Sequence, residues 1–248
     1  MTTYNINTSQ HKAAKVAGFA YLLLIIGSIL HHSIVELNLI VSENTAAIAN
    51  FITTNELLFR IGIAGDLLLI VCGIILYLAL YVILRIINEN LALLALILLS
   101  IQASLSVVIE LTSFIVLLLL NGEDYLTVFK TEQLQALVGL VLNIRASGYN
   151  VVILLFCPGS IIFAYLFFKS RYIPKTLAAA GIFSFLLMLI WTLVKVILPN
   201  YKSMIVMVEM IALICSVPVL LYQIIIGMWL LFKGINAPPQ DNHVLKPA

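Results

Sequence analysis

Residues 57–86, LLFRIGIAGDLLLIVCGIILYLALYVILRI, decide the fold of this chain. Between Arg60 and Arg85 the one charged side chain is Asp66, and most of the other residues are aliphatic. A helix of about 20 predominantly apolar residues crosses the hydrocarbon core of a bilayer, and this stretch is longer than that. It therefore predicts a transmembrane helix.

The composition of the whole chain agrees with this stretch. Of the 248 residues, 63% are hydrophobic and 10% are charged, and the mean hydropathy is +1.15. A soluble globular domain carries about 25% charged residues, so the composition excludes this class. The net charge is only +2, and no basic stripe interleaves with aromatic residues, which excludes nucleic acid as a partner. Membrane lipids are the expected surroundings of the chain.

Five further apolar stretches join the first one and predict an all-α integral membrane bundle of about six transmembrane helices. The expected spans are 16–40, 57–86, 91–120, 134–168, 177–198 and 204–232. The fourth is too long for one crossing and contains Gly148 and Pro158, so we expect a membrane-surface helix that leads into a kinked span. Residues 1–15 are an expected N-terminal segment before a retained first span, and residues 233–248 an expected disordered tail.

Basic residues predict the orientation in the membrane, because short loops rich in Lys and Arg stay in the cytoplasm. With the N-terminus inside, the outer loops hold only Lys130 and Lys202. The inner side then holds Lys12, Lys15, Arg85, Lys169, Arg171, Lys175, Lys233 and Lys246. Both termini are therefore expected in the cytoplasm.

The ionisable residues inside the expected spans all fall in the outer half of the membrane. They are His31, His32, Glu36, Arg60, Asp66, Glu110, Arg145, Lys195 and Glu209. A charged side chain at mid-bilayer costs about 2.5–3.5 kcal/mol on insertion scales, so such residues usually face protein or water. Their one-sided distribution predicts a polar pocket that opens outward, with a small molecule as its possible ligand.

Helical spacing limits the set of candidate pocket residues, since side chains four residues apart share a face of a helix. The candidate pocket residues are His32, Glu36, Arg60, Asp66, Gln102, Glu110, Arg145 and Tyr149. Asp66 points about 120° away from Arg60 on the same helix, so its partner must come from another span. Arg60 and Glu36 lie near span ends, where snorkelling to headgroups is an alternative interpretation.

Asp66 and Glu110 lie deeper and leave two interpretations open. A carboxylate at that depth is either protonated or paired with a base such as Arg60 or Arg145. In one interpretation these residues form a structural ion pair between helices, and in the other they bind a ligand, carry protons or act in catalysis.

Motifs for metals, cofactors and common enzyme classes are missing. His31 and His32 point about 100° apart on a helix and H-E-x-x-H is absent, so no metal site is expected. No G-x-S-x-G, P-loop or G-x-G-x-x-G occurs, so no cofactor is indicated and the sequence leans away from an enzyme. The three cysteines are expected to be small buried hydrophobes. Gly62 and Gly65 are expected to allow close helix packing.

Several stretches resemble one family. They are AGFAYL at 17–22, LFRIGIAGDLL at 58–68, Ile101-Gln102-Ala103, EQLQAL at 132–137, Gly148-Tyr149 and KSRYIP at 169–174. With these motifs the chain resembles the domain of unknown function 4386 family from about Lys12 to Gly234. The resemblance implies a bacterial inner-membrane protein with several spans and implies no reaction. It draws attention to Arg60 and Asp66, which belong to its most specific motif.

Three hypotheses about function follow. The favoured one is a non-enzymatic membrane protein that binds a lipid or small molecule in the pocket, or that serves as a structural or accessory protein. The second is a small transporter with Asp66 and Glu110 as proton or cation sites. The third is an intramembrane enzyme in which His31, His32 or Glu110 acts as acid or base.

Overall fold

The computed structural model describes residues 8–31, 45–121, 130–198 and 205–235, which form helices and no strand. The helices are α1 (Thr8–His31), α3 (Thr45–Thr54), α4 (Glu56–Leu84), α5 (Glu89–Leu120), α6 (Thr131–Ser170), α7 (Lys175–Ile197) and α8 (Ile205–Phe232). Six of them are long and apolar enough to cross a membrane, with mean hydropathies between 2.0 and 3.0 in their most apolar windows. The prediction of an all-α bundle with six membrane-spanning helices is confirmed.

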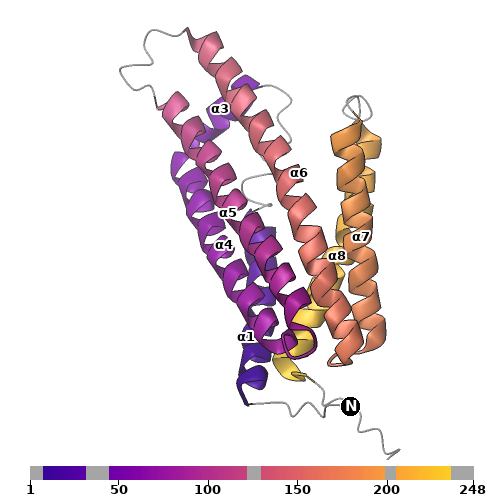
Figure 1. Ribbon diagram of the computed structural model, residues 1–248. Helices are drawn as coiled ribbons and strands as arrows, with labels where there is room; N and C mark the ends of the chain where they lie inside the picture. The colour runs from indigo at the N-terminus through magenta and orange to yellow at the C-terminus, as the bar shows by residue number, and fades with distance from the viewer. Residues whose placement is uncertain (1–7, 32–44, 122–129, 199–204, 236–248) are drawn as a thin grey trace, which may run out of the picture.

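The six long helices form a ring in which each runs antiparallel to the next (Figure 1). Helix α1 packs against α4 and α8, and α5, α6 and α7 complete the circle between these two. We call the end that carries Thr8 and Phe232 the near end, and the opposite end the far end. This order brings residues far apart in the sequence to the same central space.

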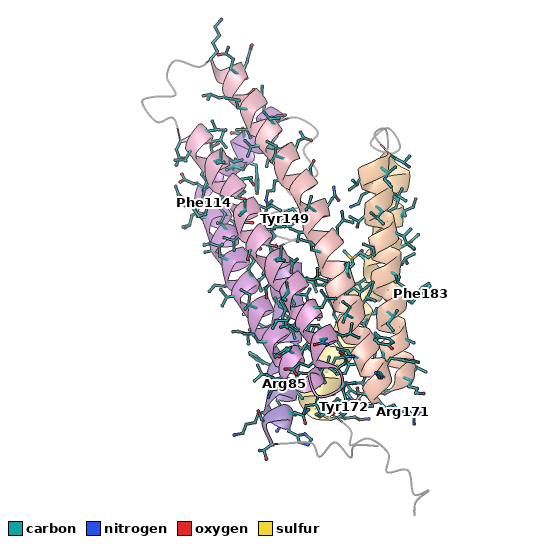
Figure 2. The ribbon with its side chains drawn as sticks, in the orientation of Figure 1. Arg85, Phe114, Tyr149, Arg171, Tyr172 and Phe183 are labelled. Atoms are coloured by element: carbon teal, nitrogen blue, oxygen red, sulfur yellow. The ribbon has the colours of Figure 1, made fainter. Side chains whose placement is uncertain are left out.

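The outer surface of the ring is apolar. Phe114 and Phe183 lie on the outside of the bundle (Figure 2), and 66% of Phe183 is exposed. Many other large aliphatic side chains on these helices are at least one-third exposed. Such a surface suits contact with lipid hydrocarbon rather than water.

The interior at the near end is closely packed. Leu80, Ile83, Phe167, Ile226 and Leu230 come from α4, α6 and α8, and each is 2% exposed or less. These side chains form one continuous core. The near end of the ring is therefore closed by protein.

Helix α1 begins earlier than predicted, at Thr8 rather than Val16. The polar Gln10 is only 2% exposed because its side-chain Nε2 donates a hydrogen bond to the carbonyl oxygen of Ile83, at 3.1 Å. This contact ties the start of α1 to the end of α4. Residues 8–15 of the expected N-terminal segment are therefore helical and belong to α1.

The chain continues for three described residues after α8, as far as Ile235. Gly234 takes a φ of 70° after α8, and its N–H donates to the carbonyl oxygen of Trp229 at 3.0 Å. This left-handed position suits glycine, and it turns the chain back so that Ile235 is only 3% exposed. Residues 233–235 therefore belong to the folded bundle, and residues 236–248 lie outside the described part of the chain.

The fourth span is one continuous helix, α6, and not a surface helix followed by a kinked span. A Cβ at Gly148 would come within 2.9 Å of Ile109, and one at Gly159 within 2.6 Å of Leu99. Gly148 and the Pro158-Gly159 pair thus mark close packing against α5 rather than a break. With 40 residues, α6 is about 60 Å long, roughly twice the hydrocarbon thickness.

The expected loop 41–56 contains a short helix, α3, which contacts α4, α5 and α6 at the far end. Its Ile52 is completely buried beside Phe59, Val116 and Val138 in a second apolar core. Helix α3 therefore packs against the part of α6 that extends beyond the bilayer thickness.

Candidate functional site

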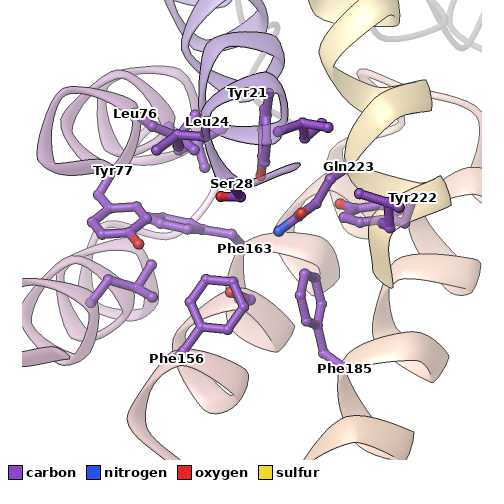
Figure 3. A pocket seen from close by; sticks show the side chains of 15 residues that line it. Tyr21, Leu24, Ser28, Leu76, Tyr77, Phe156, Phe163, Phe185, Tyr222 and Gln223 are labelled. Atoms are coloured by element: carbon purple, nitrogen blue, oxygen red, sulfur yellow. The ribbon is translucent and has the colours of Figure 1, made fainter. Parts of the chain in front are cut away.

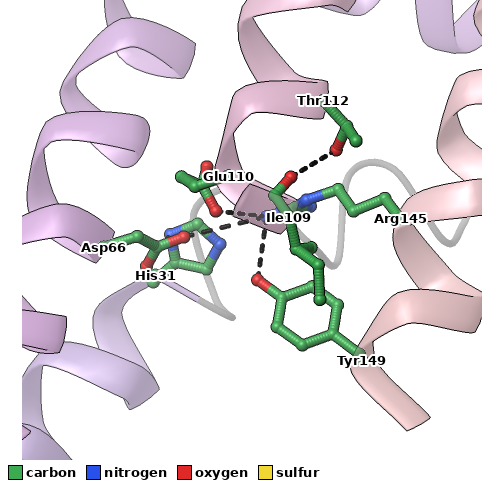
Figure 4. Close-up of polar contacts among 7 residues, drawn as sticks. All are labelled: His31, Asp66, Ile109, Glu110, Thr112, Arg145 and Tyr149. Carbon is green, nitrogen blue, oxygen red and sulfur yellow. Dashed lines mark hydrogen bonds and ion pairs between the residues drawn. The ribbon is translucent and has the colours of Figure 1, made fainter. Parts of the chain in front are cut away.

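Four ionisable side chains from four helices meet inside the ring (Figure 4). His31 ends α1, Asp66 lies on α4, Glu110 on α5 and Arg145 on α6. His31 Nδ1 lies 3.0 Å from Asp66 Oδ1. Arg145 Nη2 lies 3.7 Å from Asp66 Oδ2 and 3.4 Å from Glu110 Oε2. We call these four residues the polar cluster.

Arg145 is the centre of the polar cluster. Its Nη2 donates a hydrogen bond to the hydroxyl oxygen of Tyr149 at 3.3 Å, and its guanidinium carbon lies 5.3 Å from the centroid of the Tyr149 ring. The spacing of four residues on α6 predicted this pair. Only 9% of the Arg145 side chain is exposed, so its charge acts in a medium of low dielectric constant.

Glu110 is the most buried member, with 1% of the residue exposed. Its Oε2 accepts from Arg145, whereas its buried Oε1 has no hydrogen-bond partner among the described residues. The hydroxyl of Ser113, one turn along α5, is also buried and has no partner in the part of the chain that the structure describes. Buried polar atoms in native proteins nearly always have partners. A donor from outside the chain would satisfy the Glu110 oxygen.

A polar stripe on α5 continues from Glu110 toward the near end. Gln102 Nε2 donates to Ser106 Oγ, and the Tyr77 hydroxyl of α4 donates to Gln102 Oε1, both at 3.0 Å. Ser106 Oγ in turn donates to the Gln102 carbonyl oxygen at 3.1 Å. The spacing of four residues predicted that Gln102, Ser106 and Glu110 share one face of α5.

The polar cluster borders a cavity of about 670 Å³, which we call the wide chamber. His31, Asp66, Glu110 and Tyr149 belong to its wall, whereas Arg145 lies behind this wall. The remaining wall is largely aliphatic, from α1, α4, α5 and α8. The wide chamber therefore presents carboxylates within an apolar surface.

A second cavity of about 220 Å³ lies toward the near end, and its wall includes residues of all six long helices (Figure 3). We call it the aromatic chamber, because its wall includes Tyr21, Tyr77, Phe156, Phe163, Phe185 and Tyr222. The Gln223 amide points into the space between the rings. The two chambers adjoin, since the residues that line both are Leu24, Ser28, Tyr77 and Leu220.

The structure brings together most of the predicted pocket residues that it describes, namely Asp66, Gln102, Glu110, Arg145 and Tyr149. Arg60 is elsewhere: its Nε donates to Glu56 Oε1 at 2.7 Å, and 48% of its side chain is exposed. The two residues are four apart on α4 and therefore share one face of the helix. His32 and Glu36 lie outside the described residues.

Arg60 should therefore contribute little to stability or binding. An exposed ion pair in water gains little because solvent screens both charges. We expect the Arg60→Gln variant to keep the wild-type unfolding temperature and the wild-type set of bound molecules, measured by thermal unfolding and native mass spectrometry in mild detergent. A clear loss of either would show that Arg60 acts beyond its surface pair.

The aromatic chamber was missed in the sequence, because its rings come from five different helices and no spacing along one helix connects them. Within the described residues no group of three His, Cys, Asp or Glu side chains is arranged to hold a metal ion. The three cysteines are free; Cys157 and Cys215 are buried and Cys72 is partly buried.

The sequence comparisons agree with the fold. The family model for a domain of unknown function, DUF4386, matches residues 16–234. No curated protein and no solved structure matches the chain. The match covers the polar cluster, both chambers and nearly the whole helix ring. The chain therefore belongs to the DUF4386 family.

Proposed function

We propose that this protein binds a small amphiphilic molecule inside its helix ring. The polar part of the ligand lies at the polar cluster in the wide chamber, and the apolar part enters the aromatic chamber. The observation that carries the proposal is the pair of adjoining chambers with opposite character. Ligand sites are typically apolar cavities with a few converging polar groups.

The closed near end favours binding over transport. A transporter needs a path from the cavity to the second side of the membrane. In this structure Ile83, Phe167 and Ile226 lie in the continuous core at that end, and each is 1% exposed or less. An intramembrane enzyme finds less support, because the sequence carries none of the catalytic motifs sought above.

The distribution of basic residues supports the proposed orientation. Under the positive-inside rule, both termini lie in the cytoplasm and the wide chamber lies in the outer half of a bacterial inner membrane. A ligand in this arrangement reaches the wide chamber from the outer leaflet or from the outer aqueous side.

Native mass spectrometry of protein extracted in mild detergent tests the proposal. We expect wild-type protein to carry a discrete bound mass, and the Ser28→Phe variant to lose it. Ser28 lies where the two chambers adjoin, so a phenyl ring there fills the space that the ligand occupies. The matched control is Ser104→Phe, which makes the same change at an exposed site on α5.

The Ser104→Phe control distinguishes a molecule bound in the cavity from lipid bound to the outer surface of the ring. Ser104→Phe should keep the bound mass, because its side chain lies outside both chambers. If all three proteins carry the same masses, or none carries any, the cavity is not a ligand site and the proposal fails.

A further inference from the structure

We infer that the occupant of the cavity is an organic cation: an ammonium group that carries apolar substituents. The inference rests on the proposed function, since it names the chemical class of that same ligand. It follows from the charge of the wide chamber, from a buried oxygen in its wall that has no donor among the described residues, and from the rings of the aromatic chamber.

The charge of the wide chamber favours a cation. Asp66 and Glu110 both belong to its wall, and no Lys or Arg is among the described residues that line either chamber. Counted as ionised groups, the two carboxylates and Arg145 sum to −1 while His31 is neutral. A buried excess charge is costly unless a partner compensates it. A ligand cation supplies this partner at the open side of the cluster.

The geometry around Glu110 supports the same class. Glu110 Oε2 faces Arg145, while Oε1 lies buried with no hydrogen-bond donor in the described part of the chain. An ammonium group brings both a positive charge and, where it carries hydrogen, a donor. Charge-assisted hydrogen bonds are about twice as strong as neutral ones.

The aromatic chamber suits the substituents and the charge of such a ligand. Phe156 and Phe185 meet edge to face with ring centroids 5.6 Å apart, and Phe185 and Tyr222 do so at 5.5 Å. Aromatic rings attract cations through their faces, and Tyr77, which lines both chambers, brings one such ring to the wall of the wide chamber. The volume of about 220 Å³ accommodates a small apolar group rather than a long acyl chain.

An anionic ligand fits this site poorly. A carboxylate or phosphate in the wide chamber would face the like charges of Asp66 and Glu110, and no Lys or Arg is among the described residues of its wall. Arg145 does not compensate it, because its Nη2 already contacts Glu110, Asp66 and Tyr149 from behind the wall.

Isothermal titration calorimetry in mild detergent tests the inference with three probes of similar size. They are benzylammonium, a cation that carries N–H donors; benzyl alcohol, which is neutral; and phenylacetate, an anion. We expect the cation to bind at least about tenfold more tightly than either of the others. This comparison uses wild-type protein, so it holds even where a cavity variant fails to fold.

Matched variants show which part of the protein binds the cation. Glu110→Gln removes one carboxylate from the chamber wall and should weaken binding of benzylammonium by about tenfold. Glu56→Gln removes the same charge from the exposed start of α4 and should leave the affinity unchanged. Ser28→Phe should abolish binding.

The outcomes also separate this inference from the proposed function. Preferred binding of phenylacetate or benzyl alcohol that Ser28→Phe abolishes would overturn the cation and keep a ligand site. No bound mass and no probe binding would overturn both. A last measurement repeats the titration of the cation in nanodiscs of phosphatidylethanolamine and of phosphatidylglycerol. Weaker binding of the probe in phosphatidylethanolamine would identify a lipid ammonium as the natural ligand, and equal binding in both lipids would indicate a free amine. Both results support a cation.

Discussion

The Arg145→Met variant is expected to unfold at a much lower temperature than the wild type. Methionine keeps much of the apolar length of the side chain but removes the positive charge that faces Asp66 and Glu110. Only 2% of the Glu110 side chain is exposed, so water cannot replace the lost guanidinium. Breaking a buried ion pair by removing one partner costs about 3–5 kcal/mol. Thermal unfolding in mild detergent, followed by tryptophan fluorescence, measures the loss.

Two further variants show whether the loss arises from the buried charge. Arg60→Gln removes a guanidinium from the exposed surface and should leave the unfolding temperature unchanged. Adding Glu110→Gln to Arg145→Met removes the carboxylate that has lost its partner, and it should restore a measurable part of the stability. If Arg145→Met is as stable as Arg60→Gln, the polar cluster does not hold the four helices together.

The ends of α5 and α7 could be predicted well, because the length of an apolar stretch in lipid sets the length of the helix. The apolar stretch 91–120 became α5 (Glu89–Leu120), and 177–198 became α7 (Lys175–Ile197). The same reasoning required Asp66 to find a partner on another helix, which the structure supplies as His31 and Arg145. The length of an apolar stretch and the cost of burying a charge both depend on one segment alone, so they can be judged from the sequence.

The errors concern features that depend on neighbouring helices. Gly148 and Pro158 looked like breaks in 134–168, because the sequence does not show that α5 packs against the small residues of α6. Helix α3 was read as a loop, since its ten residues are too few to cross a bilayer and Ile52 is buried only by residues from other helices.

In the candidate site, too, features on a single helix were predicted and features that depend on neighbouring helices were not. The stripe of Gln102 and Glu110 and the pair of Arg145 and Tyr149 lie on single helices, so spacing located them. The aromatic chamber and the surface position of Arg60 depend on which face of each helix turns toward the ring. In an apolar chain nearly every face is hydrophobic, and hydrophobic periodicity therefore gives little information about rotation.

Gly18 marks the closest approach of α1 to α8, and Gly18→Ala is expected to be strongly destabilising. A Cβ at this position would lie 2.5 Å from the backbone nitrogen of Leu231 and 2.7 Å from the carbonyl oxygen of Gly227. Backbone atoms within a helix cannot move aside as a flexible side chain does, so the two helices must separate. Small residues allow membrane helices to pack this closely. Overpacking costs about 1–3 kcal/mol, and we expect the upper part of that range or more.

Gly65→Ala is the matched control for this prediction. Gly65 was predicted to be a packing site, but a Cβ there would meet nothing within 4 Å, which contradicts that prediction. Alanine also has a higher helix propensity than glycine, so Gly65→Ala should be as stable as the wild type or slightly more stable.

The contact between α1 and α8 closes the ring, and Tyr21 and Tyr222 of these helices line the aromatic chamber. Gly18→Ala should therefore also weaken retention of the bound mass in native mass spectrometry, whereas equal behaviour of the two variants would show that the ring does not depend on this contact.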